Sequence, residues 1–279
     1  MTFYKYKIIN DFTLDSLKNK YFYYSRQEQL DDPFDMYTPV DILRTDEEIR
    51  EYFRRDPELA SKYTVDSFRK KQEASEFDEE YHNKFLKVNQ MFHVLSLTPL
   101  NDNDAMWALY ADNYTGIAIG YKALEESNNK YSISLGQINQ QRKFLLQQGK
   151  DRFYENPDLR IIINPVEYDL SKLVKFTPLC TDPLEMLGNI FIKKPIWQFE
   201  KEYRSVIISP WHMIDELKIY YPDGVLSEII FGYRTKKENI QRIATLIKEN
   251  YRNQQEIRFY KAIPNRNKMS IELQEITWR

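Results

Sequence analysis

Apolar and polar residues alternate at the start of the chain. Across residues 3–9, aromatic or apolar side chains alternate with lysines, which predicts a half-buried strand. Residues 13–20 then suit a short helix, and the aromatic run at 21–25 predicts a second strand. The segment Asp31-Asp32-Pro33-Phe34-Asp35 follows, where a proline and three carboxylates favour a turn and oppose a helix. The chain therefore opens with a strand, a helix, a strand and an acidic turn.

Helical periodicity governs the next part of the chain. Thr45 and Glu48 have the spacing of a capping box, and apolar residues recur every three or four positions between Phe77 and Phe92. We therefore expect a helical insert at residues 40–91.

Strands and helices alternate through the remaining two thirds of the sequence. The polar segment 122–160 has no clean period, with a helix favoured at 137–148. No repeat or linker is visible, so we predict a single domain, 1–279, of the α+β class. The predicted strands are 93–98, 116–121, 161–168, 202–209, 217–221, 228–232, 256–262 and 270–277, and the predicted helices are 102–112, 182–194 and 236–251.

Composition narrows the function classes. The 279 residues are 42% hydrophobic and 29% charged, with net charge −2, which is typical of a globular protein and does not demand nucleic acid or an anionic membrane as partner. Cys180 is the only cysteine, which excludes an intrachain disulfide framework and a cysteine-rich metal site. The sequence shows no signal peptide and no long apolar segment, so we expect a cytoplasmic location without membrane contact. Because the first glycine is Gly116, a glycine-rich phosphate loop is excluded from the N-terminal 115 residues.

The strongest candidate for chemistry is the segment from Trp197 to Arg204. Glu200 and Glu202 lie two apart at the predicted start of a strand, so we expect both to project from one face. The aromatic residues among them would raise a carboxylate pKa or press the carboxylate against a cationic substrate. The alternative is a structural ion-pair network in which Arg204 or Lys193 neutralises the two carboxylates.

Weaker candidates lie on the preceding elements. Ser96 and Thr98 place two hydroxyls on one face of a strand, which suits hydrogen bonding to a ribose or phosphate. Trp107 and Tyr110, three apart on a helix, either line a pocket and stack on a planar ring or belong to the core.

The acidic turn and the histidines give no metal signal. Asp32 and Asp35 have the spacing of turn-forming residues, and no histidine or further carboxylate cluster stands at a ligand spacing. His82, His93 and His212 are isolated, and Cys180 is expected to be a small buried residue. We therefore predict no metal.

Taken together, these segments resemble a bacterial family, domain-of-unknown-function family 2971. The family is marked by an aromatic opening, an Asn-Asp-Pro-Phe-Asp turn, a Trp-x-x-Tyr-Ala helix and a Trp-x-x-Glu-x-Glu-x-Arg signature. This sequence has Asp31 in place of the usual asparagine and Tyr114 where a histidine is common. The matching segments are Tyr4-Lys5-Tyr6, residues 31–35, Ser96-Leu97-Thr98, residues 106–112, Lys193, residues 197–204 and Ile229-Ile230-Phe231-Gly232.

The order of these features is also similar to that of ADP-ribosyltransferases of the Arg, Ser-Thr-Ser, Glu-x-Glu type. This second resemblance implies a split, mainly antiparallel sheet and NAD as substrate. It places Tyr4, Lys5 or Tyr6 at the position that grips NAD, and Ser96 with Thr98 at the strand that supports the nicotinamide ribose. It assigns Glu202 to stabilising the oxocarbenium-like transition state and Glu200 to the acceptor, with Trp107 or Tyr110 stacking on a base.

The functional hypothesis is therefore ADP-ribose transfer from NAD to a protein or nucleic-acid acceptor, or NAD hydrolysis, in a toxin or phage-defence role with a possible neutralising or regulatory partner. Two alternatives stay open. One is a metal-dependent nuclease that uses Asp32, Asp35, Glu200 and Glu202. The other is a non-catalytic module that binds a nucleotide or a regulatory partner.

Overall fold

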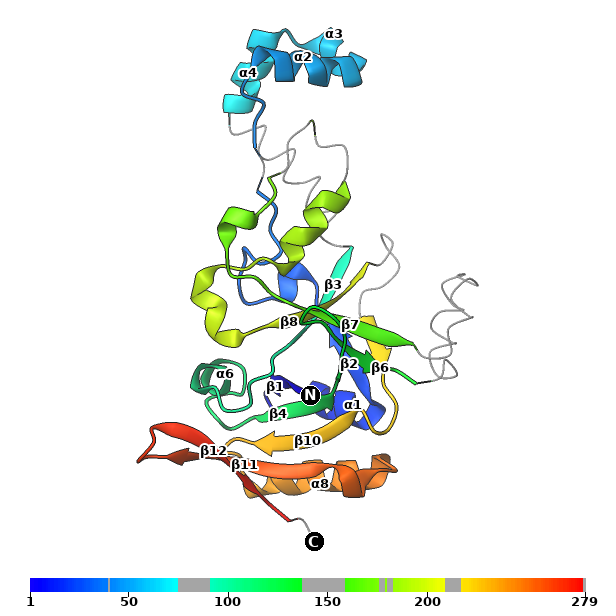
Figure 1. Ribbon diagram of the computed structural model, residues 1–279, viewed down its shortest axis with the longest axis vertical. Helices are drawn as coiled ribbons and strands as arrows, with labels where there is room; N and C mark the ends of the chain where they lie inside the picture. The colour runs from blue at the N-terminus through cyan, green and yellow to red at the C-terminus, as the bar shows by residue number, and fades with distance from the viewer. Residues whose placement is uncertain are drawn as a thin grey trace.

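The computed structural model describes residues 1–39, 41–74, 91–136, 159–175, 179, 183–208 and 217–277. The predicted helix at 137–148, the apolar series from Phe77 to Val88, and His82, Cys180 and His212 lie outside these residues. The described part of the chain forms helices and mainly antiparallel sheets, which confirms the α+β class (Figure 1).

The first sheet has five strands in the order β1-β4-β10-β11-β12. All neighbours are antiparallel except β10 and β11, which run parallel because helix α8 (Lys237–Asn250) crosses between them. Strand β10 is buried along its whole length, as expected for a central strand. Helix α8 buries one stripe of apolar residues, and it packs beside α1 (Asp11–Asn19). The strands are β1 (Thr2–Lys7), β4 (Ile117–Lys122), β10 (Leu226–Phe231), β11 (Arg258–Asn265) and β12 (Ser270–Glu275).

A second, fully antiparallel sheet has the order β3-β8-β7-β6-β5, and β2 pairs with β9 in a separate ribbon. Isolated bridges join Tyr4 to Thr98 and Ser25 to Val94, so β3 lies beside the middle of β1 and the end of β2. The strands are β2 (Tyr21–Tyr24), β3 (Phe92–Leu97), β5 (Leu124–Glu125), β6 (Tyr131–Ser134), β7 (Arg160–Pro165), β8 (Tyr203–Ile208) and β9 (Leu217–Tyr220).

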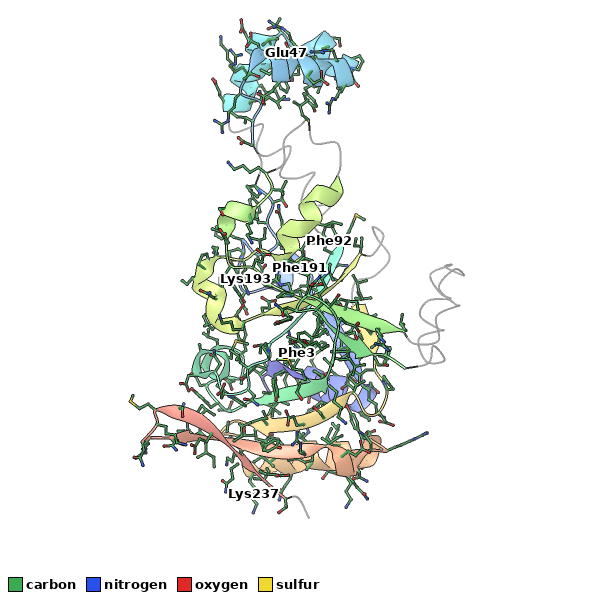
Figure 2. All side chains as sticks on the ribbon, viewed as in Figure 1. Phe3, Glu47, Phe92, Phe191, Lys193 and Lys237 are labelled. Atoms are coloured by element: carbon green, nitrogen blue, oxygen red, sulfur yellow. The ribbon has the colours of Figure 1, made fainter. Side chains whose placement is uncertain are left out.

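The main core fills the space between the two large sheets. Figure 2 shows Phe3 of β1 in this interior, where its ring makes edge contacts at 4.9 Å with both Tyr131 and Tyr203 of the second sheet. The edge where β1 meets β3 forms one wall of the candidate site.

Three short helices lie within the predicted insert and stand apart from the sheets in Figure 1: α2 (Asp46–Arg55), α3 (Pro57–Lys62) and α4 (Val65–Glu73). The expected capping box is present, since Thr45 accepts from the Glu48 amide and Glu48 accepts from the Thr45 amide. Phe68 is the centre of a small separate core that includes Leu43 and Ile49.

The segment before β8 differs from the prediction. A single α-helix was expected at 182–194, ended by Pro195. The structure instead has two 3₁₀ helices, η4 (Pro183–Phe191) and η5 (Pro195–Glu200). Pro195 begins the second of these, because a proline lacks only an N–H that has no helical partner at that position. The remaining short helices are α6 (Asp104–Leu109) and the 3₁₀ turns η1 (Gln27–Gln29), η3 (Leu170–Lys172) and η6 (Gln254–Glu256).

Candidate functional site

A cavity of about 400 Å³ opens where β1, β3, α6, the acidic turn (residues 31–35) and η5 meet. Trp107 and Arg204, both predicted as site residues, do not line it, because both are fully buried. The structure thus brings together ten of the twelve predicted site residues from four segments of the chain. Those lining the cavity are Tyr4, Lys5, Tyr6, Ser96, Thr98, Tyr110, Lys193, Trp197, Glu200 and Glu202.

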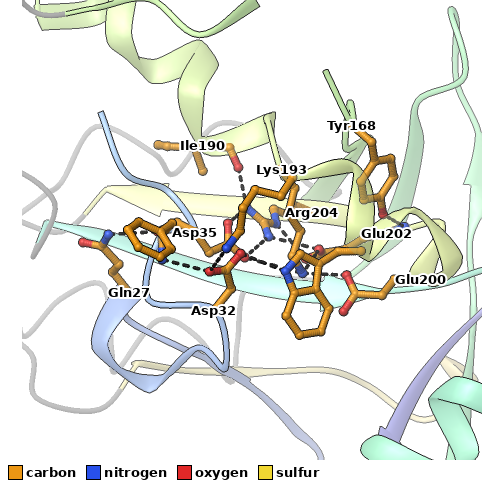
Figure 3. Close-up of polar contacts among 12 residues, drawn as sticks. Gln27, Asp32, Asp35, Tyr168, Ile190, Lys193, Glu200, Glu202 and Arg204 are labelled. Carbon is orange, nitrogen blue, oxygen red and sulfur yellow. Dashed lines mark hydrogen bonds and ion pairs between the residues drawn. The ribbon is translucent and has the colours of Figure 1, made fainter. Parts of the chain in front are cut away.

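Arg204 organises one side of the cavity from beneath (Figure 3). Its Nε and Nη2 donate to Glu202 at 2.7 and 3.0 Å, and Nη1 and Nη2 donate to the two oxygens of Asp35 at 2.8 and 2.6 Å. Nη1 also donates to the carbonyl of Ile190 at 2.6 Å. All five N–H groups of the guanidinium therefore have acceptors. One side chain fixes β8, η4 and the acidic turn relative to one another.

The acidic turn is held by its own carboxylates. Asp32 accepts from the Phe34 amide at 3.0 Å, from the Trp197 indole at 2.8 Å and from the Lys194 ammonium at 2.9 Å. The turn-forming role predicted for Asp32 is thus present, and its bond to Trp197 also fixes η5. Asp35, directed inward, pairs with Arg204.

Lys193 lies between the acidic turn and the two glutamates. Its ammonium is 2.5 Å from a Glu200 oxygen, 3.0 Å from Glu202 and 3.5 Å from Asp35, and it stands 5.1 Å from the centre of the Trp197 ring. Burial lowers the Lys193 pKa, but the three carboxylates outweigh burial and hold the pKa above its usual value. Lys193 is therefore a permanent cation that draws the carboxylates together.

Glu200 and Glu202 converge for a different reason from the one predicted. They do not share one strand face, because Glu200 ends η5, Lys201 is left-handed (φ 46°) and β8 begins only at Tyr203. The left-handed residue turns the chain sharply, and both carboxylates reach Lys193.

The pKa values of the two glutamates are shifted in opposite directions. Burial raises the pKa of Glu202, but the charges of Arg204 and Lys193 and a hydrogen bond from Ser96 outweigh it and hold the pKa far below its usual value. Burial and the negative charge of Glu202 raise the pKa of Glu200, and the Tyr110 hydroxyl donates to Glu200 at 2.6 Å. Glu202 therefore stays ionised, whereas Glu200 takes up a proton at a higher pH than an ordinary glutamate does.

Strand alternation separates the three candidates on β1. The Tyr4 hydroxyl donates to Glu228, and the Tyr6 hydroxyl donates to the carbonyl of Leu100 at 3.1 Å. Lys5 projects from the opposite face and lines the cavity. Its ammonium has no hydrogen bond or ion pair within the part of the chain that the structure describes. Of the three, Lys5 alone offers an uncommitted polar group to a ligand.

Burial also sets the charge of Lys5. Desolvation, reinforced by the positive charge of Lys7, lowers the Lys5 pKa to about 7, against the opposing effect of Glu202 and Glu200. A substantial fraction of Lys5 is therefore neutral at physiological pH.

The hydroxyls of Ser96 and Thr98 are bonded to groups of the protein, and their predicted bonding to a ribose or phosphate stays a prediction. Ser96 stands opposite Arg204 in the strand register and hydrogen-bonds the Glu202 carboxylate. The Thr98 hydroxyl accepts from the Leu100 amide at 3.2 Å, and the Thr98 backbone pairs with Tyr4. Ser96 thus orients an acidic group, whereas Thr98 mainly secures the junction of β1 and β3.

Trp107 was left open between pocket wall and core, and it belongs to the core. Its indole donates to the carbonyl of Asn101 at 3.0 Å, and its ring packs edge-on against Tyr6 at 5.0 Å. A fully buried ring cannot stack on a ligand in the cavity, so that expectation is wrong for Trp107. Tyr110 does line the cavity, but its hydroxyl holds Glu200.

The sequence reasoning missed several residues of the site, among them Lys7 and Tyr168. Lys7 lines the cavity two residues beyond Lys5 on the same strand face, and the alternation at the start of the sequence contains that signal. Tyr168 accepts from the Glu202 amide at 2.8 Å, and no sequence pattern links these two residues.

No set of three His, Cys, Asp or Glu residues in the described ranges could hold a metal ion. Four carboxylates at the cavity are bonded to cationic side chains: Asp32 to Lys194, Asp35 to Arg204, and Glu200 and Glu202 to Lys193. The arrangement is suited to charge stabilisation and proton transfer by side chains.

Residues 106–205 match the model of a family described as "Protein of unknown function (DUF2971)". The match confirms the family resemblance drawn from the motifs, and it spans α6 to the start of β8, including Tyr110, Lys193, Glu200 and Glu202. No curated protein and no solved structure matches the chain. Among the residues described, no helix is long and apolar enough to cross a membrane.

Proposed function

We propose that the cavity binds NAD and cleaves the bond between nicotinamide and ribose, as ADP-ribosyltransferases do. The observation that carries the proposal is the meeting of Ser96, Glu200 and Glu202 at one cavity whose other wall is β1 with Lys5. These are the three positions that the resemblance requires, and they come from distant parts of the chain.

The states of the two glutamates suit the reaction. Loss of nicotinamide develops positive charge on the ribose, and an ionised Glu202, held by Ser96 and Arg204, would stabilise that charge electrostatically. Glu200, with its raised pKa, would accept the proton of the attacking hydroxyl or water. A pair of carboxylates with divergent pKa values is the usual arrangement for dividing such roles.

The distribution of charge also fits a dinucleotide that carries a pyridinium cation and a diphosphate. The carboxylates come from η5, the start of β8 and the acidic turn, whereas Lys5 and Lys7 come from β1. Glu200 and Glu202 act on the pKa of Lys5, while burial alone lowers that of Lys7. Lys7, the second cation of β1 that lines the cavity, is the residue we assign to the diphosphate.

The acceptor would be a protein, a nucleic acid or water, and a toxin or phage-defence role is part of the proposal. The nuclease alternative receives one supporting observation, since Asp32 and Asp35 lie at the same cavity as the glutamates. Their oxygens are bonded to cationic side chains, however, so a divalent metal would have to displace Arg204 or Lys194. We therefore retain the NAD reaction as the proposal.

The test is to incubate the purified protein with NAD, alone and with cell extract, and to follow nicotinamide release by chromatography. We expect Glu200→Gln and Glu202→Gln each to lower release by at least about 100-fold. Glu228→Gln is the matched control, because Glu228 is equally buried and hydrogen-bonded to Tyr4 but does not line the cavity.

Near-normal release by both cavity variants would contradict the proposal, as would the absence of NAD binding by the wild type in calorimetry. Circular dichroism verifies that each variant is folded, and Glu200→Gln keeps the test valid if loss of Glu202 unfolds the chain. A parallel nuclease assay with Mg²⁺ or EDTA tests the alternative.

A further inference from the structure

We propose that Lys5 is a nucleophilic amine that condenses with the aldehyde of a phosphorylated sugar bound in the cavity and forms a Schiff base. The class of ligand is an aldose phosphate in its open-chain form. ADP-ribose, the product of the proposed NAD cleavage, belongs to this class, and for that ligand alone the inference rests on the proposed function.

The position of Lys5 is the first argument. It lies in the middle of β1, with hydrogen-bonded neighbours in β4 on one side and the Tyr4–Thr98 bridge on the other, so its backbone is fixed. Its side chain lines the cavity, and its ammonium is unbonded within the described ranges, whereas Lys193 bonds two glutamates there. A fixed backbone and an uncommitted amine are what a nucleophilic lysine requires.

The surroundings supply the second argument, because only a neutral amine has the lone pair that attacks a carbonyl. An ordinary lysine is about 0.1% neutral near pH 7.4. Burial, then the charge of Lys7 and, more weakly, that of Lys193, lower the pKa of Lys5 to about 7, while Glu202 and Glu200 oppose them. The cavity is also lined by three tyrosine rings and by Asp31, Asp32 and Asp35 of the acidic turn, of which Asp32 and Asp35 are bonded to other cations.

The chemistry balances with groups already at the cavity. The amine attacks the aldehyde carbon, a C–N bond forms, and the carbonyl oxygen takes up a proton to give a carbinolamine. Expulsion of that oxygen as water needs an acid, and Glu200, whose raised pKa favours the protonated form, is the candidate. The product is an imine at Lys5 and one molecule of water, and no oxidant or metal is consumed.

Lys7 explains the preference for a phosphate. It follows Lys5 by two residues on the same face of β1, a separation of roughly 6.5 Å along the strand. Lys7 also lines the cavity, and its ammonium lies 5.7 Å from the centre of the Phe12 ring. A phosphate carried by the sugar is expected to pair with this second lysine of β1.

The experiment traps the imine by reduction. The full chain is incubated at pH 7.5 with ribose 5-phosphate and sodium cyanoborohydride, and the modified lysines are located by peptide mass spectrometry. We expect Lys5 to be modified at least about 10-fold faster than the exposed Lys237, and Lys5→Arg to lose that modification. A parallel reaction with ADP-ribose tests the larger ligand.

A second variant tests whether the positive charge of Lys7 sets the reactivity of Lys5, and it keeps the test valid if Lys5→Arg does not fold. Lys7→Gln removes a positive neighbour and so raises the Lys5 pKa, and we expect slower trapping of the neutral aldehyde glyceraldehyde at pH 7.5, with the rate recovered at pH 9. With ribose 5-phosphate the loss should be larger, because the phosphate contact is also removed.

Labelling of Lys5 no faster than that of Lys237 would overturn the inference. NAD cleavage without trapping at Lys5 would leave the proposed function standing and reject this one. Trapping at Lys5 without NAD cleavage would leave this inference standing and reject the proposed function. The two proposals therefore fail independently.

Discussion

Replacement of Arg204 by lysine should destabilise the protein strongly although the charge is kept. The guanidinium makes five hydrogen bonds to Glu202, Asp35 and the Ile190 carbonyl and is fully buried. A lysine has three donors on one nitrogen, so at least two charge-assisted bonds are lost. At about 1.5 kcal/mol each, the expected loss in the free energy of unfolding is about 3 kcal/mol.

Urea unfolding followed by circular dichroism measures this loss. The matched control is Arg242→Lys, because the ion pair of Arg242 with Asp11 is exposed and should contribute less than about 1 kcal/mol. A double-mutant cycle with Arg204→Met and Asp35→Leu adds a second measurement. The double variant should be more stable than the sum of the single losses predicts, because neither charge is then left buried alone.

A loss below about 1 kcal/mol for Arg204→Lys would refute this reasoning. It would mean that the lysine reaches the same acceptors, or that water replaces the lost donors. In either case Arg204 would not be the residue that fixes the acidic turn against β8.

Two further predictions concern stability. Between pH 7 and 10.5 the unfolded chain holds a proton on Lys5 that the folded chain has lost, so the wild type gains stability as pH rises through this range. Lys5→Met should therefore have a free energy of unfolding higher than that of the wild type at pH 7, by on the order of 2 kcal/mol, and the difference should shrink toward pH 10. Urea unfolding at both pH values measures this difference, and an equal difference at the two would contradict the prediction. A Cβ at Gly232 would stand 2.0 Å from the Tyr114 carbonyl oxygen, so Gly232→Ala should cost about 3 kcal/mol. Gly188→Ala, where nothing lies within 4 Å, is its control in thermal unfolding, and similar melting temperatures for the two variants would disprove the clash.

The strand pattern was predictable where one face is buried. The alternation at residues 3–9 gave β1 to within two residues, and the apolar runs gave β8 and β10. The 3₁₀ helices were not predictable, because Pro183 and Pro195 mark a helix start equally well for either helix type. The pairing of β1 with β4 and β3 was also not predictable, because the alternation of apolar and polar residues predicts a strand but not the strands that pair with it.

At the site, the sequence predicted which residues take part better than it predicted which partners they bond. The Glu-x-Glu-x-Arg segment identified the two glutamates and their arginine, but not the partner of that arginine, Asp35, which lies 169 residues away in sequence. Among Tyr4, Lys5 and Tyr6, the alternation indicates that the lysine opposes the tyrosines. All three line the cavity, and only their contacts in the described residues show that the Tyr4 and Tyr6 hydroxyls are already bonded whereas the Lys5 ammonium is not.

The sequence left two interpretations of the glutamates, a reactive pair or a structural ion network. In the structure, the two interpretations apply to different residues. Arg204 and Asp35 form the structural network, because both are buried and bonded to each other by two hydrogen bonds. Apolar side chains of similar volume would hold that contact at no net loss of stability. They would not keep Glu202 ionised beside Ser96. The ion network is therefore best understood as the support that keeps the Glu202 carboxylate charged at the cavity.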